Sequence, residues 1–193
     1  MQAGCAPGLF VSGPGREVYA RVAPSVVAVE TSAQRGLRVG SGVTVAPGRV
    51  LTACHVLDPS GNAVVRRAGK PHSARLSHRQ GASDLCELAA PGLHAPAVEI
   101  TPVSDLRPGE PLFAVGIPGG YVPELSEGTF TGIAGHGDET YIQSSSRIAP
   151  GWSGGGVFDQ RGRLVGVLTF VLSSPAGEFN YAVPVIPQAA NGP

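Results

Sequence analysis

The sequence predicts an all-β protein that consists of two packed six-stranded antiparallel β-barrels. The chain of 193 residues contains 28 glycines and 18 prolines, and 42% of its residues are hydrophobic. So much glycine and proline can indicate a disordered linker, but such a linker would contain far fewer apolar residues. Short apolar or alternating runs instead recur between turn residues, as expected for barrel strands. No segment predicts a helix longer than one or two turns.

Two groups of six strands are predicted, one on each side of a proline- and glycine-rich segment near residues 91–96. Residues 25–31 form the first strand, as their β-branched side chains and alternation indicate. Turns at residues 46–48 and 159–162 predict hairpins, because glycine tolerates the positive φ found in tight turns. The other strands of the first group are residues 42–45, 49–53, 63–67, 72–77 and 85–89. The second group comprises residues 111–117, 127–134, 140–145, 155–158, 163–171 and 179–185.

The chain length suits one domain or two small lobes that share an interface. Residues 1–16 are rich in glycine and proline and are expected to be a flexible segment. Residues 17–186 are expected to form the folded part, with an N-terminal barrel over 17–100 and a C-terminal barrel over 106–186. Residues 187–193 remain as a C-terminal tail.

Charge and cysteine content exclude several function classes. Lysine plus arginine and aspartate plus glutamate number 14 each, without a basic run, so no nucleic-acid partner is expected. No apolar stretch approaches the roughly 18–20 residues that cross a bilayer. The N-terminus does not resemble an intact signal peptide, although Ala3-Gly4-Cys5 resembles the end of a lipoprotein cleavage box. The cysteines, which include Cys54 and Cys86, form no C-x-x-C pair, so a structural zinc site is not expected. No cofactor is expected either.

A serine in a glycine-rich turn is the first candidate for a catalytic residue. Ser153 lies in the sequence PGWSGGG, residues 150–156, between two apolar strands. Glycines let backbone N–H groups converge on an oxyanion beside an exposed hydroxyl, as acyl transfer requires. Taken alone, the motif fits an ordinary glycine-rich hairpin equally well.

The order of histidines and aspartates narrows the class of hydrolase. No histidine follows Ser153, which excludes an α/β-hydrolase elbow. A subtilisin-type order requires an aspartate before the histidine, and the first aspartate is Asp58. Only His72 or a later histidine could then act as base, and none of them lies in a constrained apolar setting. The remaining order is histidine, aspartate, serine.

His55 and Asp84 are the best candidates for the first two positions. His55 follows the apolar run that begins at Val50, where packing would hold it in place as a base requires. Asp84 opens an apolar strand, where an unpaired carboxylate would be costly. Asp58 precedes Pro59 and fits a turn. A histidine at a strand end and an aspartate that opens a strand are each more often structural, so neither decides alone.

Together, three blocks in this order resemble the trypsin-like serine peptidases, most closely the bacterial branch that includes the HtrA/Deg proteases. GSGV and VLTACHV, residues 40–43 and 50–56, resemble the family's block around the base. SDLCEL at 83–88 resembles the acid block. The family's nucleophile block is matched by three segments of this chain, YIQ at 141–143, PGWSGG at 150–155 and GRLVGV at 162–167. The segment NYAVP at 180–184 resembles the usual end of the family's domain. The likeness spans residues 17–186.

The resemblance implies two chymotrypsin-like barrels with the active site in the cleft between them. It implies Ser153 as nucleophile, His55 as general base and acid, and Asp84 as the group that fixes the histidine tautomer. The backbone N–H groups of Gly151 and Ser153 would form the oxyanion hole. The implied activity is hydrolysis of a polypeptide by a serine endopeptidase.

The same resemblance indicates where the polypeptide substrate binds. Thr169, Phe170 and Val171 would lie along the substrate strand and near the specificity pocket. That strand and Ile148-Ala149 are mostly apolar, so a small or aliphatic residue is expected before the scissile bond. Arg147 would favour acidic residues if it pointed inward, and we expect it to point outward instead.

The chain departs from the family at two points. Trp152 replaces the Asn or Asp usual before the nucleophile, so activation by proteolysis is not expected and the way this loop is held stays open. No PDZ domain is expected after the peptidase domain, and the oligomeric state is not predicted. A catalytically impaired peptide-binding module and an esterase remain as alternatives.

The proposed triad also places two cysteines close together. If His55 contacts Asp84, Cys54 and Cys86 lie on the two strand ends that meet there. The pair is then either a disulfide or two packed thiols, since a bond needs Cα atoms within about 4.4–6.8 Å. A disulfide would favour a periplasmic or secreted location over the cytoplasm.

Overall fold

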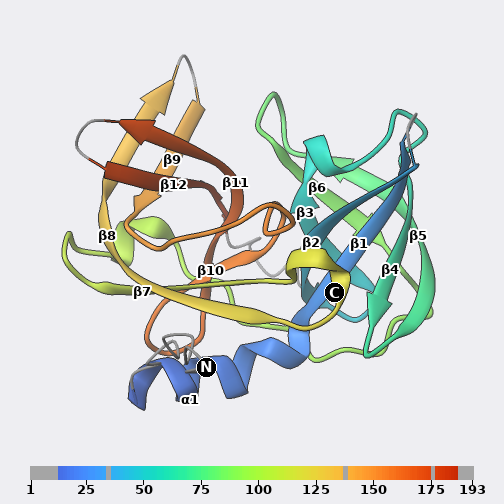
Figure 1. Ribbon diagram of the computed structural model, residues 1–193, viewed down its shortest axis with the longest axis horizontal. Helices are drawn as coiled ribbons and strands as arrows, with labels where there is room; N and C mark the ends of the chain where they lie inside the picture. The colour runs from blue at the N-terminus through green and yellow to red at the C-terminus, as the bar shows by residue number, and fades with distance from the viewer. Residues whose placement is uncertain (1–12, 34–35, 137–138, 175–176, 187–193) are drawn as a thin grey trace, which may run out of the picture.

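Two β-barrels lie side by side and make up most of the molecule (Figure 1). The computed structural model describes residues 13–33, 36–136, 139–174 and 177–186. Each barrel is closed by six antiparallel strands, which confirms the predicted fold class. The first contains β1 (Val26–Ala33), β2 (Gly36–Ala46), β3 (Arg49–Ala53), β4 (Asn62–Arg67), β5 (Lys70–Arg79) and β6 (Leu85–Ala89). The second contains β7 (Pro111–Gly116), β8 (Glu124–His136), β9 (Glu139–Ser144), β10 (Gly156–Phe158), β11 (Leu164–Ser174) and β12 (Gly177–Pro184).

The strand order, which the sequence did not predict, is β1-β2-β3-β6-β5-β4 in the first barrel and β10-β11-β12-β9-β8-β7 in the second. Four short 3₁₀ helices lie within the described residues: η1 (Ala23–Ser25) directly before β1, and η2 (Cys54–Val56), η3 (Val103–Asp105) and η4 (Pro118–Gly120) between strands. Within the described residues, no helix is both long and apolar enough to cross a membrane.

Both faces of β1 are buried because successive side chains of a strand point to opposite sides. Val27 and Val29 pack inside the first barrel, whereas Val26 and Ala28 belong to an apolar cluster shared with the second barrel. That shared cluster includes residues of both barrels, such as Val43, Leu51, Leu85, Phe113 and Phe158. Apolar burial of this kind stabilises by about 25 cal/mol per Å², so the barrels are fixed relative to each other.

Helix α1 (Gly13–Val22) corrects two expectations, the absence of a longer helix and flexibility up to residue 16. Its start is a poor helix signal, because it reads Gly-Pro-Gly and its first turn lacks an acidic residue. Tertiary packing stabilises it instead: Val18 and Val22, four residues apart, are buried in the shared cluster. Residues 1–12 and the predicted tail, 187–193, lie outside the described residues.

The helix precedes the first barrel in sequence but is hydrogen-bonded to segments around the second. The Tyr19 hydroxyl donates to the carbonyl of Pro123 at 2.8 Å, and Arg21 donates to the carbonyl of Arg161 at 2.7 Å. The first residues of the predicted N-terminal lobe are therefore attached to connecting segments of the second barrel.

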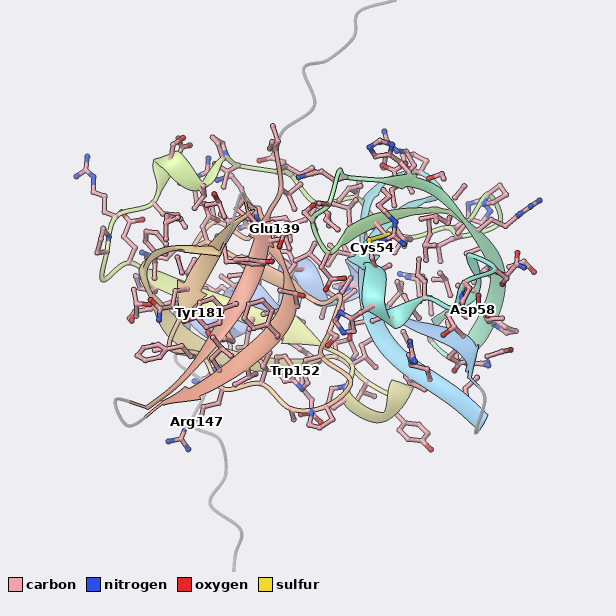
Figure 2. All side chains as sticks on the ribbon, turned by 90° about the horizontal axis from the view of Figure 1, so that it is seen from above. Cys54, Asp58, Glu139, Arg147, Trp152 and Tyr181 are labelled. Carbon is pink, nitrogen blue, oxygen red and sulfur yellow. A yellow bond between two sulfur atoms is a disulfide. The ribbon has the colours of Figure 1, made fainter. Side chains whose placement is uncertain are left out.

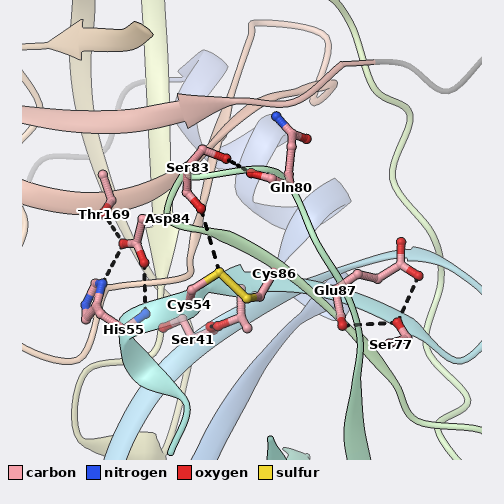
Figure 3. The surroundings of a disulfide bond; sticks show 11 residues. Ser41, Cys54, His55, Ser77, Gln80, Ser83, Asp84, Cys86, Glu87 and Thr169 are labelled. Atoms are coloured by element: carbon pink, nitrogen blue, oxygen red, sulfur yellow. Dashed lines mark hydrogen bonds and ion pairs between the residues drawn. A yellow bond between two sulfur atoms is a disulfide. The ribbon is translucent and has the colours of Figure 1, made fainter. Parts of the chain in front are cut away.

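Cys54 and Cys86 form a disulfide, with their Cα atoms 5.0 Å apart (Figure 3). Cys54 opens η2 directly after β3, and β3 pairs with β6 so that Ala53 lies opposite Leu85. The pairing of these two strands therefore brings the cysteines together. Of the two arrangements that the sequence left open, the structure shows the bond.

Removal of this disulfide is expected to lower the free energy of unfolding by about 3–4 kcal/mol, because it constrains the unfolded chain between cysteines 32 positions apart. Urea unfolding of the Cys54→Ala/Cys86→Ala variant measures the effect. Dithiothreitol should destabilise the wild type by a similar amount and leave the variant unchanged. Equal responses of the two proteins to the reductant would contradict the bond.

Candidate active site

The candidate base and its acidic partner lie at the same end of two paired strands (Figure 3). His55 lies in η2 after β3, and Asp84 immediately precedes β6. Nδ1 of His55 lies 2.6 Å from Oδ2 of Asp84, and the backbone N–H of His55 donates to Oδ1 at 2.8 Å. An ionised carboxylate only accepts hydrogen bonds, so Nδ1 carries a proton, and in the neutral imidazole Nε2 is then the acceptor.

Asp84 is also hydrogen-bonded to the second barrel, since the hydroxyl of Thr169 donates to Oδ2. Burial raises the pKa of this carboxyl, but hydrogen bonds from His55 and Thr169 outweigh it and leave the pKa below the ordinary value of 3.8. Asp84 is therefore ionised at neutral pH and fixes the orientation of His55.

Ser153 lies in the loop before β10, and this loop is fastened to the first barrel. The backbone N–H of Ser41, on β2, donates to the carbonyl of Ser153 at 2.8 Å. The Ser41 hydroxyl donates to the carbonyl of Gly151, also at 2.8 Å. The Ser153 hydroxyl donates to the carbonyl of Thr169 at 3.4 Å. Thr169 thus contacts both the candidate nucleophile and Asp84, and connects the two.

A tight turn precedes Ser153. The N–H of Trp152 donates to the carbonyl of Ala149 at 3.1 Å, with Pro150 and Gly151 at the central positions. Gly151 has φ +94°. Proline followed by glycine with positive φ is typical of a type II turn. The turn therefore fixes the direction of the Gly151 N–H group.

Two N–H groups of this loop, those of Gly151 and Ser153, have no acceptor among the described residues. The neighbouring carbonyls are occupied, because those of Gly151 and Ser153 accept from Ser41 and that of Trp152 accepts from the N–H of Gly155 at 2.8 Å. A pair of unused N–H groups beside a serine hydroxyl provides the donors that an oxyanion hole requires.

Apolar packing of Trp152 holds the loop that carries Ser153. The sequence alone left open how this loop is held. Trp152 is 4% exposed and belongs to the core cluster of the second barrel (Figure 2). Its indole lies against Gly116, where an added Cβ would come within 3.0 Å of the ring. Its Nε1 has no hydrogen-bond partner in the described structure, so van der Waals contact fixes the side chain.

Gly154→Ala is expected to destabilise the fold by about 3 kcal/mol or more. Gly154 has φ +87°, and an added Cβ would collide with the Ser41 carbonyl and the Thr52 hydroxyl. Gly69→Ala is the matched control, because Gly69 has φ +79° and no atom within 4 Å of an added Cβ. The control should cost about 1–2 kcal/mol. Urea unfolding compares the two variants, and equal costs would contradict the close approach at Gly154.

The family model of the trypsin-like peptidase domain matches residues 40–167, which include His55, Asp84 and Ser153. The chain belongs to this family. A probable periplasmic serine endoprotease, DegP-like, from Pseudomonas fluorescens is 28% identical over 179 residues, covering 88% of this chain and 38% of that protein. The serine protease PepD of Mycobacterium tuberculosis is 30% identical over 182 residues, covering 80% of this chain and 38% of that protein. The chain thus spans well under half the length of these curated relatives.

Solved structures show the same fold. The HtrA-type protease AlgW with tripeptide is 26% identical, with TM-score 0.78, and the match covers 88% of this chain and 59% of that one. The active form of the Rv3671c protease from M. tuberculosis has TM-score 0.79 at 24% identity, with coverages of 95% and 84%. The latter similarity supports the fold alone.

In this trypsin-like peptidase domain, three of the predicted substrate-binding residues lie together on β11 beside the nucleophile. Thr169, Phe170 and Val171 follow the point at which β11 leaves its pairing with β10. β12 pairs with β11 on the other edge, and Phe170 stacks on Tyr181 with ring centroids 4.9 Å apart. Within the described structure, no strand pairs with this short segment on the edge that faces away from β12, although the Thr169 carbonyl accepts from the Ser153 hydroxyl. This free edge is where another chain could pair.

Arg147 is exposed, and its guanidinium points away from the molecule (Figure 2). This is the outward orientation expected from the sequence. Its backbone N–H donates to the Ser126 hydroxyl at 2.8 Å, which fixes the main chain here while the side chain extends outward.

Sequence reasoning missed the polar residues that fasten the site. Ser41 lies in the GSGV segment, residues 40–43, and the sequence indicates no role for its hydroxyl. A buried cluster was also missed: Asn180 Nδ2 donates to the Ser146 carbonyl at 2.8 Å, and the Ser146 N–H donates to the Ser144 hydroxyl at 3.1 Å. This cluster holds the segment before Ser153 against β12. The available signal was a polar residue inside the apolar run FNYAV, residues 179–183.

Proposed function

We propose that the protein is a serine endopeptidase with Ser153 as nucleophile, His55 as general base and Asp84 as orienting acid. The observation that carries the proposal is the convergence of three distant segments. Asp84, which holds the imidazole of His55, and the Ser153 hydroxyl are both hydrogen-bonded to Thr169, and two unused N–H groups lie in the loop that carries Ser153. Membership in the trypsin-like peptidase family supports the same assignment.

Acylation follows from the proton positions. With Nδ1 of His55 protonated toward Asp84, Nε2 accepts the proton of the Ser153 hydroxyl as Oγ attacks the scissile carbonyl. The resulting oxyanion is bound by the N–H groups of Gly151 and Ser153. Nε2 then protonates the departing amine, and the peptide bond breaks to leave an acyl-enzyme.

Deacylation repeats the sequence with water. Nε2 of His55 removes a proton from water, which attacks the acyl carbonyl, and the proton then returns to Oγ of Ser153. Asp84 stays ionised throughout, because the charge on the imidazolium stabilises its carboxylate further.

The proposed substrate is an extended polypeptide whose backbone pairs with the free edge of Thr169–Phe170–Val171. Strand addition of this kind supplies main-chain hydrogen bonds next to the nucleophile. We retain the preference for a small or aliphatic residue before the scissile bond, because Arg147 points outward and places no charge inward. The proposed location is the periplasm or outside the cell, which the disulfide and the similarity to a probable periplasmic endoprotease support.

One observation favours a second candidate, a catalytically impaired peptide-binding module. The Ser153 hydroxyl donates to the carbonyl of Thr169 rather than to His55. Long or misdirected catalytic hydrogen bonds are common without substrate and tighten when it binds, so we prefer the active enzyme.

Incubation with an unfolded protein, followed by mass spectrometry of the products, separates these candidates. An endopeptidase releases peptides from internal bonds, whereas a binding module retains the chain intact. An esterase on the same scaffold would hydrolyse only activated esters, so a matched pair of amide and ester substrates is included. Failure to cut any peptide bond under all conditions tested would overturn the proposal.

A further inference from the structure

We infer that Arg38 recognises a carboxylate on the departing side of the scissile bond. The inference rests on the proposed peptidase function and names a substrate feature that this function leaves open. The carboxylate belongs either to an Asp or Glu side chain at the first or second position after the bond, or to the C-terminus of a short departing segment.

Arg38 is held beside the base. It lies on β2, and its Nη1 donates to the backbone carbonyl of His55 at 2.7 Å. Its partner across the β1–β2 pair, Thr31, donates its hydroxyl to the carbonyl of Val56 at 2.8 Å. Consecutive carbonyls of η2 therefore anchor both strands, and they hold the guanidinium next to His55.

The chemistry places the departing chain on this side. Because His55 must protonate the leaving nitrogen, the departing segment begins at the imidazole. The acyl segment runs along β11, which contacts Ser153 through Thr169 and belongs to the second barrel. β2, which carries Arg38, belongs to the first barrel and contacts Ser153 through Ser41. Figure 1 shows β2 and β11 in different barrels, so we place the departing segment on the β2 side of the nucleophile.

The charge of Arg38 is not neutralised. Among the described residues, no carboxylate lies within 4.0 Å of its guanidinium, whereas Arg49 pairs with Glu87 at 2.6 Å and Arg66 with Glu30 at 2.9 Å. A backbone carbonyl orients a guanidinium but leaves its charge intact. Since Arg38 is exposed and a guanidinium has five N–H donors, several remain for a substrate carboxylate.

Arg38 therefore favours acidic and disfavours basic residues just after the bond. An exposed ion pair changes a binding constant by up to about five-fold. We expect about three-fold enrichment of Asp and Glu, which should weaken in about 1 M salt, where the Debye length is about 3 Å.

The test is the cleavage profile of a peptide library, read by mass spectrometry, for the wild type, Arg38→Gln and Arg38→Glu. The Gln variant should lose the acidic enrichment, and the Glu variant should shift it toward Lys and Arg. The residue preferred before the bond should stay the same in all three. Libraries with free and with amidated C-termini distinguish the sources, since a terminal carboxylate is read only in the free library.

Arg67→Gln is the matched control, because Arg67 also donates to a backbone carbonyl, that of Pro24 at 3.1 Å, but on β4. It should leave the wild-type profile unchanged. Cleavage with no charge preference after the bond, or with a preference that survives Arg38→Gln, overturns this inference and leaves the peptidase assignment intact. A wild type that cuts no peptide overturns both.

Discussion

Ser153→Ala is expected to reduce hydrolysis of an unfolded protein by on the order of 10⁴–10⁶-fold. The substitution removes the oxygen that forms the acyl-enzyme, while the unused N–H groups of Gly151 and Ser153 remain. Its effect on stability should be small, because the one hydrogen bond that the hydroxyl makes to the described residues is long, 3.4 Å to the Thr169 carbonyl. Initial rates of product release and urea unfolding measure the two effects.

Ser77→Ala is the control for Ser153→Ala. Ser77 is exposed on β5 and donates to the Glu87 carbonyl at 3.1 Å, so its removal should leave the rate unchanged. A folded Ser153→Ala protein that retains wild-type activity would show that another residue is the nucleophile.

Asp84→Asn is expected to lower kcat by about 10⁴-fold with little change in backbone structure. An amide in place of the carboxylate can present N–H to Nδ1 of His55, which favours the tautomer protonated at Nε2. That tautomer cannot accept the Ser153 proton. Steady-state kinetics check the loss, and Asp58→Asn, which alters a partly exposed aspartate hydrogen-bonded to Ser60, should have little effect.

The same variant should change how stability depends on pH. The pKa of Asp84 is lower in the folded protein than its ordinary value of 3.8, so the ionised carboxylate stabilises the fold above that value. This contribution disappears as the pH falls through the lower, folded-state pKa. Unfolding free energies measured from neutral pH to below about pH 4 should therefore fall more steeply in the wild type than in Asp84→Asn. Parallel curves would contradict a stabilised carboxylate.

Strands that are buried on both faces could be predicted from the sequence. Elements that are stabilised by residues distant in sequence could not. The valines of β1 predict a strand because each points into one of two cores. Helix α1 escaped notice because Val18 and Val22 stabilise it only through contact with residues distant in sequence. The N-terminal part of β2, near Arg38, is exposed and shows no alternation of apolar residues. The sequence therefore did not predict that this part pairs with β1.

The candidate triad followed from chain order and apolar surroundings, but the groups that position it did not. The hydrogen bonds of Ser41 to the nucleophile loop join residues more than a hundred positions apart, and no local pattern encodes them. The orientation of the unused N–H groups of Gly151 and Ser153 depends on a turn in which Gly151 has positive φ. Glycine allows this conformation but does not require it. The packing of Trp152 against Gly116 required the barrel to be assembled first.

Labelling with a fluorophosphonate tests the central claim most directly, because the probe reacts rapidly only with a serine activated by an organised base and oxyanion hole. We predict one phosphonylated residue, Ser153, located by mass spectrometry of the digested protein, with labelling lost in His55→Ala. Absence of labelling in the folded wild type, or labelling at another serine, would contradict the assignment of Ser153 as an activated nucleophile.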